Sequence, residues 1–306
     1  MRSWRSVVLG RPVVSVAMAT YNGECYLPEM LESLAAQTRP PDELVVRDDG
    51  SEDGTVGILH AFARRVPFRV EVLAGGPRLG YAQNFVAASR ACSGDVVFFA
   101  DQDDAWRPPK LATVAQQVRR RTPLALFHDF TLMAEDGTRI ASSFYDLLAE
   151  RGLPPVAALK GCSMAVSRGF VDTWGWPPPD ARVSHDFWVA LLSTAFGQRR
   201  NLSEPLIDHR LHAANASGWI PEAASRAFTR PGDGSGPVRL LIDLVLKPPR
   251  LGARTRTFLD VIDERGYAVN PEAARRLRRL LKANRRRHQE VSGGSSCPGS
   301  TPPPPA

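Results

Sequence analysis

The sequence predicts an α/β protein whose mostly parallel central sheet is flanked by helices and followed by a helical C-terminal extension. Over about the first 130 residues, short valine-rich apolar runs alternate with segments whose apolar residues recur at helical spacing. After residue 130 this rhythm breaks, and basic helical patterns appear towards the C-terminus. Because consecutive parallel strands need a crossover connection, the alternation favours a parallel sheet with right-handed helical crossovers.

The first predicted strand, Val13 to Ala19, is an almost continuous apolar run, which is typical of a strand buried on both faces. Leu27, Met30, Leu31 and Leu34 then recur at the spacing of an amphipathic helix. The alternation continues along the chain in the same way. The predicted strands are residues 13–19, 43–47, 68–73, 95–100 and 124–128, and the predicted helices are residues 27–37, 54–65, 81–91 and 109–120.

The second half of the chain has a less regular pattern. Asp136 and Gly137 are typical turn residues and lie between two short extended segments. The expected elements are a hairpin over 132–140, a loop over 174–179, a helix over 185–195, a linker at 232–236, helices over 238–246 and 271–287, and disorder over the Ser/Gly/Pro-rich residues 292–306.

Composition is that of a globular protein, with 43% hydrophobic and 23% charged residues among 306. The four cysteines, Cys25, Cys92, Cys162 and Cys297, form no Cys-x-x-Cys pair, so we expect reduced thiols in a cytoplasmic protein. The first residues resemble a secretory signal, but Arg11 and Pro12 interrupt the apolar run, which favours a buried first strand. No run of about eighteen apolar residues predicts a membrane span.

The strongest chemical signal is an acidic cluster directly after the fourth predicted strand. Asp101, Asp103 and Asp104 lie within four residues, where carboxylates repel one another unless a cation neutralises them. Ala105 and Trp106 occupy positions that a calcium loop needs for ligands and glycine, which argues against that motif. Turn formation or helix capping are the alternatives for a lone Asp-x-Asp. At a strand end, the cluster indicates a divalent ion held against a phosphorylated ligand.

Two further polar clusters follow predicted strands, Thr20 to Asn22 and Asp48 to Ser51. In a parallel sheet, these loops and the acidic cluster project from the same edge and converge on one crevice. No Gly-x-Gly-x-x-Gly and no Gly-x4-Gly-Lys-[Ser/Thr] is present, which argues against dinucleotide-binding and P-loop proteins.

Together the clusters resemble the family 2 inverting glycosyltransferases of the glycosyltransferase A fold, over roughly residues 12 to 220. The resemblance rests on four ordered motifs: Val-Ala-Met-Ala-Thr-Tyr-Asn-Gly at 16–23, Ser-Leu-Ala-Ala-Gln-Thr at 33–38, Arg-Asp-Asp-Gly-Ser-Glu-Asp-Gly-Thr at 47–55 and Ala-Asp-Gln-Asp-Asp-Ala-Trp at 100–106. The motifs at 184–188 and 209–215 are similar to the branch that contains rhamnosyltransferases and related surface-polysaccharide enzymes.

The resemblance implies a catalytic domain over 1–231, a basic helical extension over 232–290 and a disordered tail over 291–306. Within the first, a Rossmann-like nucleotide-binding half covers about 12–130 and an acceptor half about 131–231. It implies a nucleotide-diphosphate sugar as donor, and a glycan or lipid-linked hydroxyl as acceptor. The implied donor-binding residues are Ala19, Thr20, Tyr21, Asn22, Asp49, Asp101 and Gln102, with Tyr21 packing on the base, Asp49 accepting from it and Asp101 reaching the ribose or sugar.

By the same resemblance, Asp103 is a metal ligand, and its carboxylate oxygens favour Mn²⁺ or Mg²⁺, while His212 is expected to complete the metal shell. His212 has two other interpretations, a hydrogen bond to a phosphate oxygen or an exposed loop histidine. Asp48 and Asp49 also suit a simple turn.

Asp186 is the implied catalytic base, because direct displacement at the anomeric carbon needs a group that takes the acceptor proton. Its alternative is an ordinary acid at a helix N-terminus. His185 stands where many family members have Glu or Asp, so a shared base stays open. Gly161 and Cys162 resemble the glycine-led strand that lines the acceptor site.

The net charge of +7 is concentrated in eight basic residues between Arg275 and Arg287. They are either a solvated helix face or a surface that contacts the anionic inner face of the cell membrane. No nucleic-acid-binding module accompanies them. Two rival functions remain, a nucleotide-sugar-binding protein without transferase activity and a nucleotidyltransferase. The first disagrees with the intact acidic clusters, and the second with the lack of a Gly-rich basic loop after the first strand.

Overall fold

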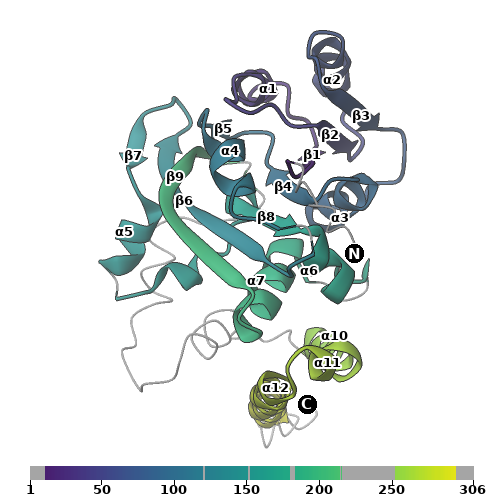
Figure 1. Cartoon of the computed structure of the whole chain (residues 1–306), viewed down its shortest axis with the longest axis vertical. Coiled ribbons are helices and arrows are strands. Elements are labelled where there is room, and N and C mark those ends of the chain that lie inside the picture. The colour runs from purple at the N-terminus through teal and green to yellow at the C-terminus, as the bar shows by residue number, and fades with distance from the viewer. Residues whose placement is uncertain are drawn as a thin grey trace, which may run out of the picture.

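A computed structural model describes residues 11–119, 121–150, 152–179, 183–213, 215 and 252–293, with side chains of the last segment described over 257–282. The predicted linker at 232–236, the predicted helix at 238–246 and residues 294–306 of the predicted disordered tail lie outside the described residues. Within the described part, nine strands form one sheet that curls through the molecule (Figure 1).

The N-terminal half of the sheet is parallel and has the order β3-β2-β1-β4. Its strands are connected by helices, as the alternating sequence pattern predicts. The elements are β1 (Val14–Thr20), α1 (Leu27–Ala35), β2 (Glu43–Asp48), α2 (Thr55–Ala63), β3 (Arg69–Leu73), α3 (Tyr81–Ala91) and β4 (Val96–Ala100). These bounds confirm the predicted elements to within about two residues.

The second half of the sheet is mixed, so the prediction of a mostly parallel sheet holds only up to β4. β8 (Met164–Ser167) runs antiparallel between β4 and β6 (Ala125–Ala134). β9 (Arg199–Leu211) pairs in parallel with β6, and β5 (Ala105–Trp106) pairs antiparallel with β9. The physical reason is that the regular strand–helix–strand crossovers end at β4, so later strands enter in either direction.

Helices cover both faces of the sheet, because residues of the central strands alternate between two cores. Val14, Val16 and Met18 of β1 pack towards α1, α2, α4 (Lys110–Ala115) and α5 (Phe144–Ala149). Ala17 packs on the other face, towards α3, α6 (Arg168–Trp174) and α7 (His185–Ala195). This three-layer arrangement leaves the carboxyl ends of β1, β2 and β4 at one edge of the sheet.

Several elements predicted for the second half of the chain differ from those in the structure. The hairpin at 132–140 is confirmed, since β6 pairs with β7 (Arg139–Ala141) and Gly137 has a φ of 85°. The helix predicted over 109–120 is shorter, α4, and the strand predicted over 124–128 extends through Ala134. The sequence did not predict α5, α6 or β9 as such, and the strand expected at Gly161 and Cys162 is instead a 3-10 turn, Gly161–Ser163, that leads into β8. The strand β9 is polar and contains Pro205, so its sequence lacks the apolar signature of the others.

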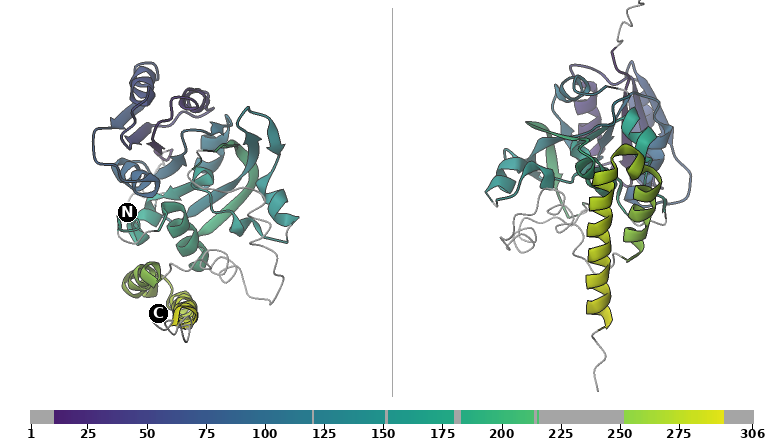
Figure 2. Two further views of the ribbon diagram at one scale, coloured as in Figure 1. Left: turned by 180° about the vertical axis from the view of Figure 1, so that it is seen from behind. Right: turned by 60° about the horizontal axis from the view of Figure 1, so that its bottom comes forward.

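The C-terminal helices pack against the body of the protein. They are α10 (Gly252–Val261), the π-helical turn Ile262–Gly266, α11 (Tyr267–Val269) and α12 (Pro271–Gly293). The Phe258 ring stacks on Trp188 of α7 at a centroid distance of 5.0 Å, and Leu277 and Leu281 of α12 join the same core. Beyond this contact, α12 runs out past the body (right view of Figure 2). Among the described residues, no helix combines the length and apolarity that a membrane span requires.

Candidate active site

A cavity of about 430 Å³ opens where the loops after β1, β2 and β4 converge, as the three polar clusters predict. Both halves of the chain contribute to its walls. The residues that line it are Ala19, Thr20, Tyr21, Asp49, Arg78, Gly80, Tyr81, Asn84, Phe85, Asp101, Gln102, Asp103, Lys160, Gly161, His185, Asp186, His209 and Asn215.

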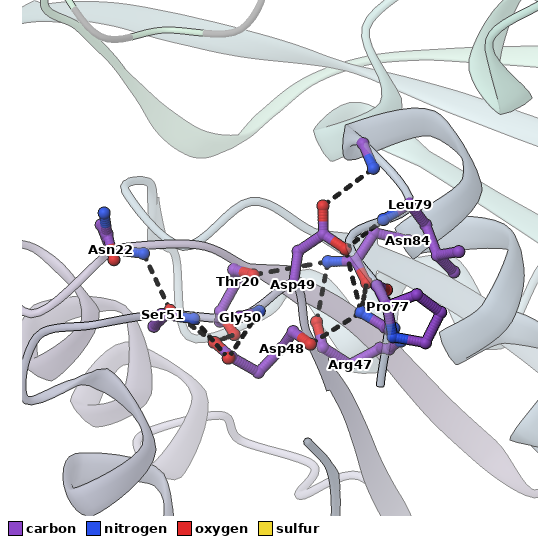
Figure 3. Close-up of polar contacts among 11 residues, drawn as sticks. Thr20, Asn22, Arg47, Asp48, Asp49, Gly50, Ser51, Pro77, Leu79 and Asn84 are labelled. Atoms are coloured by element: carbon purple, nitrogen blue, oxygen red, sulfur yellow. Dashed lines mark hydrogen bonds and ion pairs between the residues drawn. The ribbon is translucent and has the colours of Figure 1, made fainter. Parts of the chain in front are cut away.

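The buried guanidinium of Arg47 organises the wall that β2 contributes (Figure 3). Its Nη1 donates to the Asp49 carboxylate at 3.0 Å, to Asn84 Oδ1 at 2.9 Å and to the Asp48 carbonyl, while Nη2 donates to the Pro77 carbonyl at 2.7 Å. One side chain therefore joins the end of β2, the loop after β3 and helix α3. Charge pairing compensates the burial of both Arg47 and Asp49.

Asp49 also binds the backbone of the loop that precedes α3. Its Oδ1 accepts from Leu79 N–H at 2.6 Å and its Oδ2 from Gly80 N–H at 2.8 Å. Gly80 has a φ of 75°, a conformation that glycine adopts without strain, and this turns both N–H groups towards the carboxylate. The Asp48 carboxylate accepts from Thr20, Gly50 and Ser51, which fits the turn interpretation for this residue. Asp49 both builds the loop and lines the cavity.

Tyr21 lines the cavity, and the Arg78 guanidinium packs over its ring. The Arg78 guanidinium sits 3.8 Å from the centre of the Tyr21 ring, and 36% of Tyr21 is exposed. The Gln102 amide holds the Tyr21 backbone at both ends, accepting from its N–H at 2.9 Å and donating to its carbonyl at 3.0 Å. These contacts form a flat, partly open surface on which a planar base can stack.

Asn22 does not line the cavity, although the sequence placed it among the donor-binding residues. Its N–H donates to Ser51 Oγ, and its Oδ1 accepts from Glu52 N–H. With a φ of 46°, it makes the turn that joins the loops after β1 and β2. In this structure, Asn22 holds those loops together.

Asp103 and His212, 109 residues apart in the chain, meet at the edge of the cavity. A hydrogen bond of 2.7 Å joins Asp103 Oδ2 to His212 Nε2, and Asn215 Nδ2 donates to the same oxygen at 3.2 Å. His212 also packs on the Tyr26 ring. The sequence predicts this pair as ligands of Mn²⁺ or Mg²⁺, and a bound ion would take the place of the direct hydrogen bond between them.

Arg210 holds the Asp103 loop in place from the neighbouring strand β9. Its Nε donates to the Asp103 carbonyl at 3.2 Å, and its other nitrogens reach the Glu135 carbonyl and the Glu29 carboxylate. Arg210 is buried, and its contacts hold the Asp103 loop beside the end of β9, which His212 follows directly.

A second group of possible ligands lies deeper. Asp101, Asp104, Cys162 and His209 offer donor atoms within 4.8 Å of one another. His209 Nδ1 is 2.7 Å from Asp104 Oδ1, and burial disfavours charge on this imidazole, but Asp104 outweighs that effect and raises its pKa. Burial, with Asp104 and Asp103 as neighbours, raises the pKa of Asp101 to about 7. The buried amine of Lys110 donates to the Cys162 carbonyl at 2.8 Å, and burial lowers its pKa to about 7. Within this group, Asp104 therefore has His209 as its direct partner.

Asp186 lies in the first turn of α7 and faces the cavity. Its Oδ1 accepts from Phe187 N–H at 2.7 Å. Gly161 approaches closely, since a Cβ added at Gly161 would be 3.6 Å from Asp186 Cβ. Gly161 and the predicted base thus line the same cavity as Tyr21 and Asp49.

The structure brings most predicted site residues together. Eight of them, Ala19, Thr20, Tyr21, Asp49, Asp101, Gln102, Asp103 and Asp186, line the one cavity, and His212 contacts Asp103 beside it. The sequence did not point to Arg78, Lys160 or His209 as wall residues. Arg78 follows a strand end like the other loops, but its Gly/Pro-rich surroundings contain no acidic cluster that would draw attention to it.

Comparison with known proteins gives the family and fold that this chain resembles. Residues 15–133 match the family model described as glycosyl transferase family 2. This chain contains a family 2 glycosyltransferase domain. A relative from Bacillus subtilis, the putative teichuronic acid biosynthesis glycosyltransferase TuaG, is 29% identical over 202 residues, which are 63% of this chain and 79% of the relative. Among the first relatives, the matched segments span between 45% and 79% of the relative's own length.

Two solved structures share the glycosyltransferase A fold. One is Staphylococcus aureus TarS 1–349 in complex with UDP-GlcNAc, with a TM-score of 0.54 and 18% identity over 92% of this chain and 91% of that one. The other is the mannosyltransferase PcManGT from Pyrobaculum calidifontis in complex with GDP-Man and Mn²⁺, with a TM-score of 0.53 and 21% identity over 91% and 87%. The predicted fold class is therefore confirmed.

Replacing Arg47 by methionine tests its role in the family 2 domain. We expect the free energy of unfolding to fall by about 3–5 kcal/mol, because the substitution leaves Asp49 buried without its cation. Loosening of the loop at 77–80 should also weaken binding of UDP, GDP or dTDP. Urea denaturation and calorimetric titration measure the two effects. Arg65→Met is the matched control, since Arg65 pairs with Glu32 on the exposed surface and should cost at most about 1 kcal/mol. Equal losses in the two variants would contradict this role.

Proposed function

We propose that this protein transfers a sugar from a nucleotide diphosphate to an acceptor hydroxyl with inversion at the anomeric carbon, using Mn²⁺ or Mg²⁺. The observation that carries this proposal is the order of the strands whose ends carry the cavity's functional groups. In the sheet order β2-β1-β4-β8, Asp49 and Tyr21 follow β2 and β1, Asp101 and Asp103 follow β4, and Asp186 lies beside Gly161, just before β8. A nucleotide sugar has the same order of parts, from base through diphosphate to sugar.

The nucleotide end is proposed to bind by stacking and hydrogen bonding. A base that packs on Tyr21 would compete with the Arg78 guanidinium for the ring face, and Arg78 would then be free to pair with a phosphate. Asp49 would accept from a base N–H through Oδ2, which has a lone pair beyond the one that Gly80 uses, whereas Oδ1 already accepts from Leu79 and Arg47.

Asp103 and His212 would hold the divalent ion, with Asn215 orienting the carboxylate. Bound there, the ion would stabilise the negative charge that grows on the leaving diphosphate. Mn²⁺ in the PcManGT complex supports this assignment, and the donors UDP-GlcNAc and GDP-Man of the two neighbours support a nucleotide-sugar donor.

At the far end, Asp186 would accept the proton of the acceptor hydroxyl while that oxygen bonds to the anomeric carbon and the nucleoside diphosphate leaves. Phe187 N–H occupies one lone pair of its carboxylate and fixes its orientation. A single displacement from the face opposite the leaving group inverts the anomeric configuration.

Asp103→Ala tests the metal and the donor together. Wild-type protein, incubated with a panel of UDP-, GDP- and dTDP-sugars, should hydrolyse or transfer at least one of them with Mn²⁺ or Mg²⁺, and chelator should abolish this turnover. Asp103→Ala should lower metal-stimulated turnover by at least about a hundredfold, because a ligand of the ion is removed. Asp136→Ala, on the exposed hairpin turn, is the control. Full turnover in chelator, or in the Asp103 variant, would overturn the assignment.

Asp186→Asn tests the base. Turnover should fall by about 10²- to 10⁴-fold, while affinity for the nucleoside diphosphate stays unchanged, because the asparagine side chain keeps the shape but cannot take the proton. Proton NMR of the wild-type product gives its anomeric configuration. A product that retains the donor configuration would rule out the single displacement, whatever the variant does.

We further propose that the reaction belongs to cell-surface polysaccharide biosynthesis, in line with the teichuronic acid relative, and takes place at an anionic membrane surface. On α12, the exposed side chains of Arg275, Arg276, Arg279 and Lys282 form a basic surface. Leu277 and Leu281 face the core instead. The charges can therefore be changed without removing the packing of α12.

The variant with Arg275, Arg276, Arg279 and Lys282 all changed to Gln should bind phosphatidylglycerol liposomes more weakly at low salt. Each basic residue near such a surface adds about 1 kcal/mol of attraction. Sedimentation measures binding, and turnover of a soluble acceptor should be unchanged. Arg64 and Arg65 at the end of α2, both changed to Gln, serve as the control. If full-length protein ignores these liposomes, the basic surface is a solvated helix face.

A further inference from the structure

The imidazole of His185 lies in the floor of the cavity with no hydrogen-bond partner among the described residues. Only 2% of the residue is exposed. The ring packs against Phe85, at a centroid distance of 4.5 Å, and stacks on Phe99, at 5.1 Å. Neither Nδ1 nor Nε2 has a partner within the described part of the chain, yet His185 lines the cavity. Buried polar groups in folded proteins are nearly always hydrogen-bonded, so this pair of nitrogens needs an explanation.

The packing around the ring points to a ligand as the missing partner. Phe85 and Phe99, whose ring centroids are 6.1 Å apart, pack side by side against the imidazole and hold its position. A Cβ added at Gly161 would come within 2.8 Å of Nε2. Any side chain at residue 161 would therefore cover this nitrogen, and glycine leaves it within reach of the cavity.

The charge state of the His185 imidazole limits the kind of ligand that can bind it. Burial lowers the pKa of His185, although the neighbouring Asp186 acts in the opposite direction. In the neutral ring, Nε2 either donates or accepts, depending on the tautomer. A hydroxyl group, which both donates and accepts, can pair with Nε2 in either form, whereas a phosphate, which only accepts, can pair with it in one form alone.

We propose that His185 hydrogen-bonds a hydroxyl of the transferred sugar and thereby selects which sugar the enzyme accepts. This rests on the proposed function, because the sugar must lie between the diphosphate site at Asp103 and the base Asp186. His185 precedes Asp186 at the start of α7 and packs against α3 and β4, which belong to the nucleotide-binding half. It is a specificity-determining residue, and the base role belongs to Asp186.

The test compares His185→Phe and His185→Gln with the wild type. Phenylalanine keeps the shape against Phe85 and Phe99 but removes both nitrogens, whereas glutamine returns an amide near the position of Nε2. Turnover, as kcat/KM, is measured for the nucleotide sugar that the wild type accepts and for its deoxy analogues at each ring hydroxyl. Affinity for the matching nucleoside diphosphate and the melting temperature are measured alongside.

We expect kcat/KM of His185→Phe to fall roughly tenfold or more, with the affinity for nucleoside diphosphate unchanged. One deoxy analogue should lose a similar factor with wild type and nothing further with His185→Phe, since both changes remove the same hydrogen bond. His185→Gln should recover part of the activity. The melting temperature of His185→Phe should be equal or higher, because no buried polar atom is left unpaired.

His128→Gln is the matched control. His128 is a second buried histidine whose Nε2 has no partner in the described residues, but it does not line the cavity. The proposal is overturned if His185→Phe discriminates among the deoxy analogues as the wild type does, or if all analogues lose the same factor in both proteins. If His185→Phe does not fold, His185→Gln with the same analogues decides. Failure of the proposed function looks different, because the wild type would then turn over no donor.

Discussion

The buried pair of Arg47 and Asp49 is the interaction on which the nucleotide end of the cavity depends. A carboxylate at the end of β2 would be costly to bury alone, and Arg47 compensates it from the same strand. The remaining guanidinium donors then reach Asn84 on α3 and the Pro77 carbonyl in the loop after β3. The end of β2, the loop after β3 and helix α3 are thus joined by the Arg47 side chain. Arg210 has the corresponding place on the other side, where it joins the Asp103 loop to Glu29 of α1 and to the Glu135 carbonyl.

Hydrogen-bond capacity divides the carboxylates of the cavity into two kinds. Asp48 accepts from Thr20, Gly50 and Ser51 and has become part of the loop. Asp104 is paired with His209 and buried beneath the cavity. Asp103 and Asp186 keep more of their capacity, since the Asp103 contacts recorded in the described region all go to Oδ2 and the one recorded for Asp186 is its own helix N–H. The fold thus uses the proposed metal ligand and the proposed base less than it uses Asp48 or Asp49.

The N-terminal half of the fold and most of the cavity were predictable from the sequence, because each depends on local patterns. Strands β1 to β4 are apolar runs between helices, and the clusters at Thr20, Asp48 and Asp101 follow strand ends that parallel topology brings together. The second half was less predictable. β9 is polar, and β8 is a four-residue strand that is stabilised only by its neighbours β4 and β6. Arg78 and His209 line the cavity because tertiary packing places them there, and no local sequence pattern predicts this.

The basic charge of the C-terminal helices did not reveal that these helices pack against α7. Eight basic residues between Arg275 and Arg287 suggested a surface segment separate from the catalytic part. The apolar residues of the same helix, with Phe258 of α10, instead complete the core around α7, the helix that begins with His185 and Asp186. Phe258 stacks on Trp188, three residues after His185 and on the same helix, so the packing of α10 helps to hold the start of α7 against the cavity. The apolar side chains of the C-terminal helices therefore support the start of α7, while their basic side chains are exposed. The two sets of residues can be changed independently.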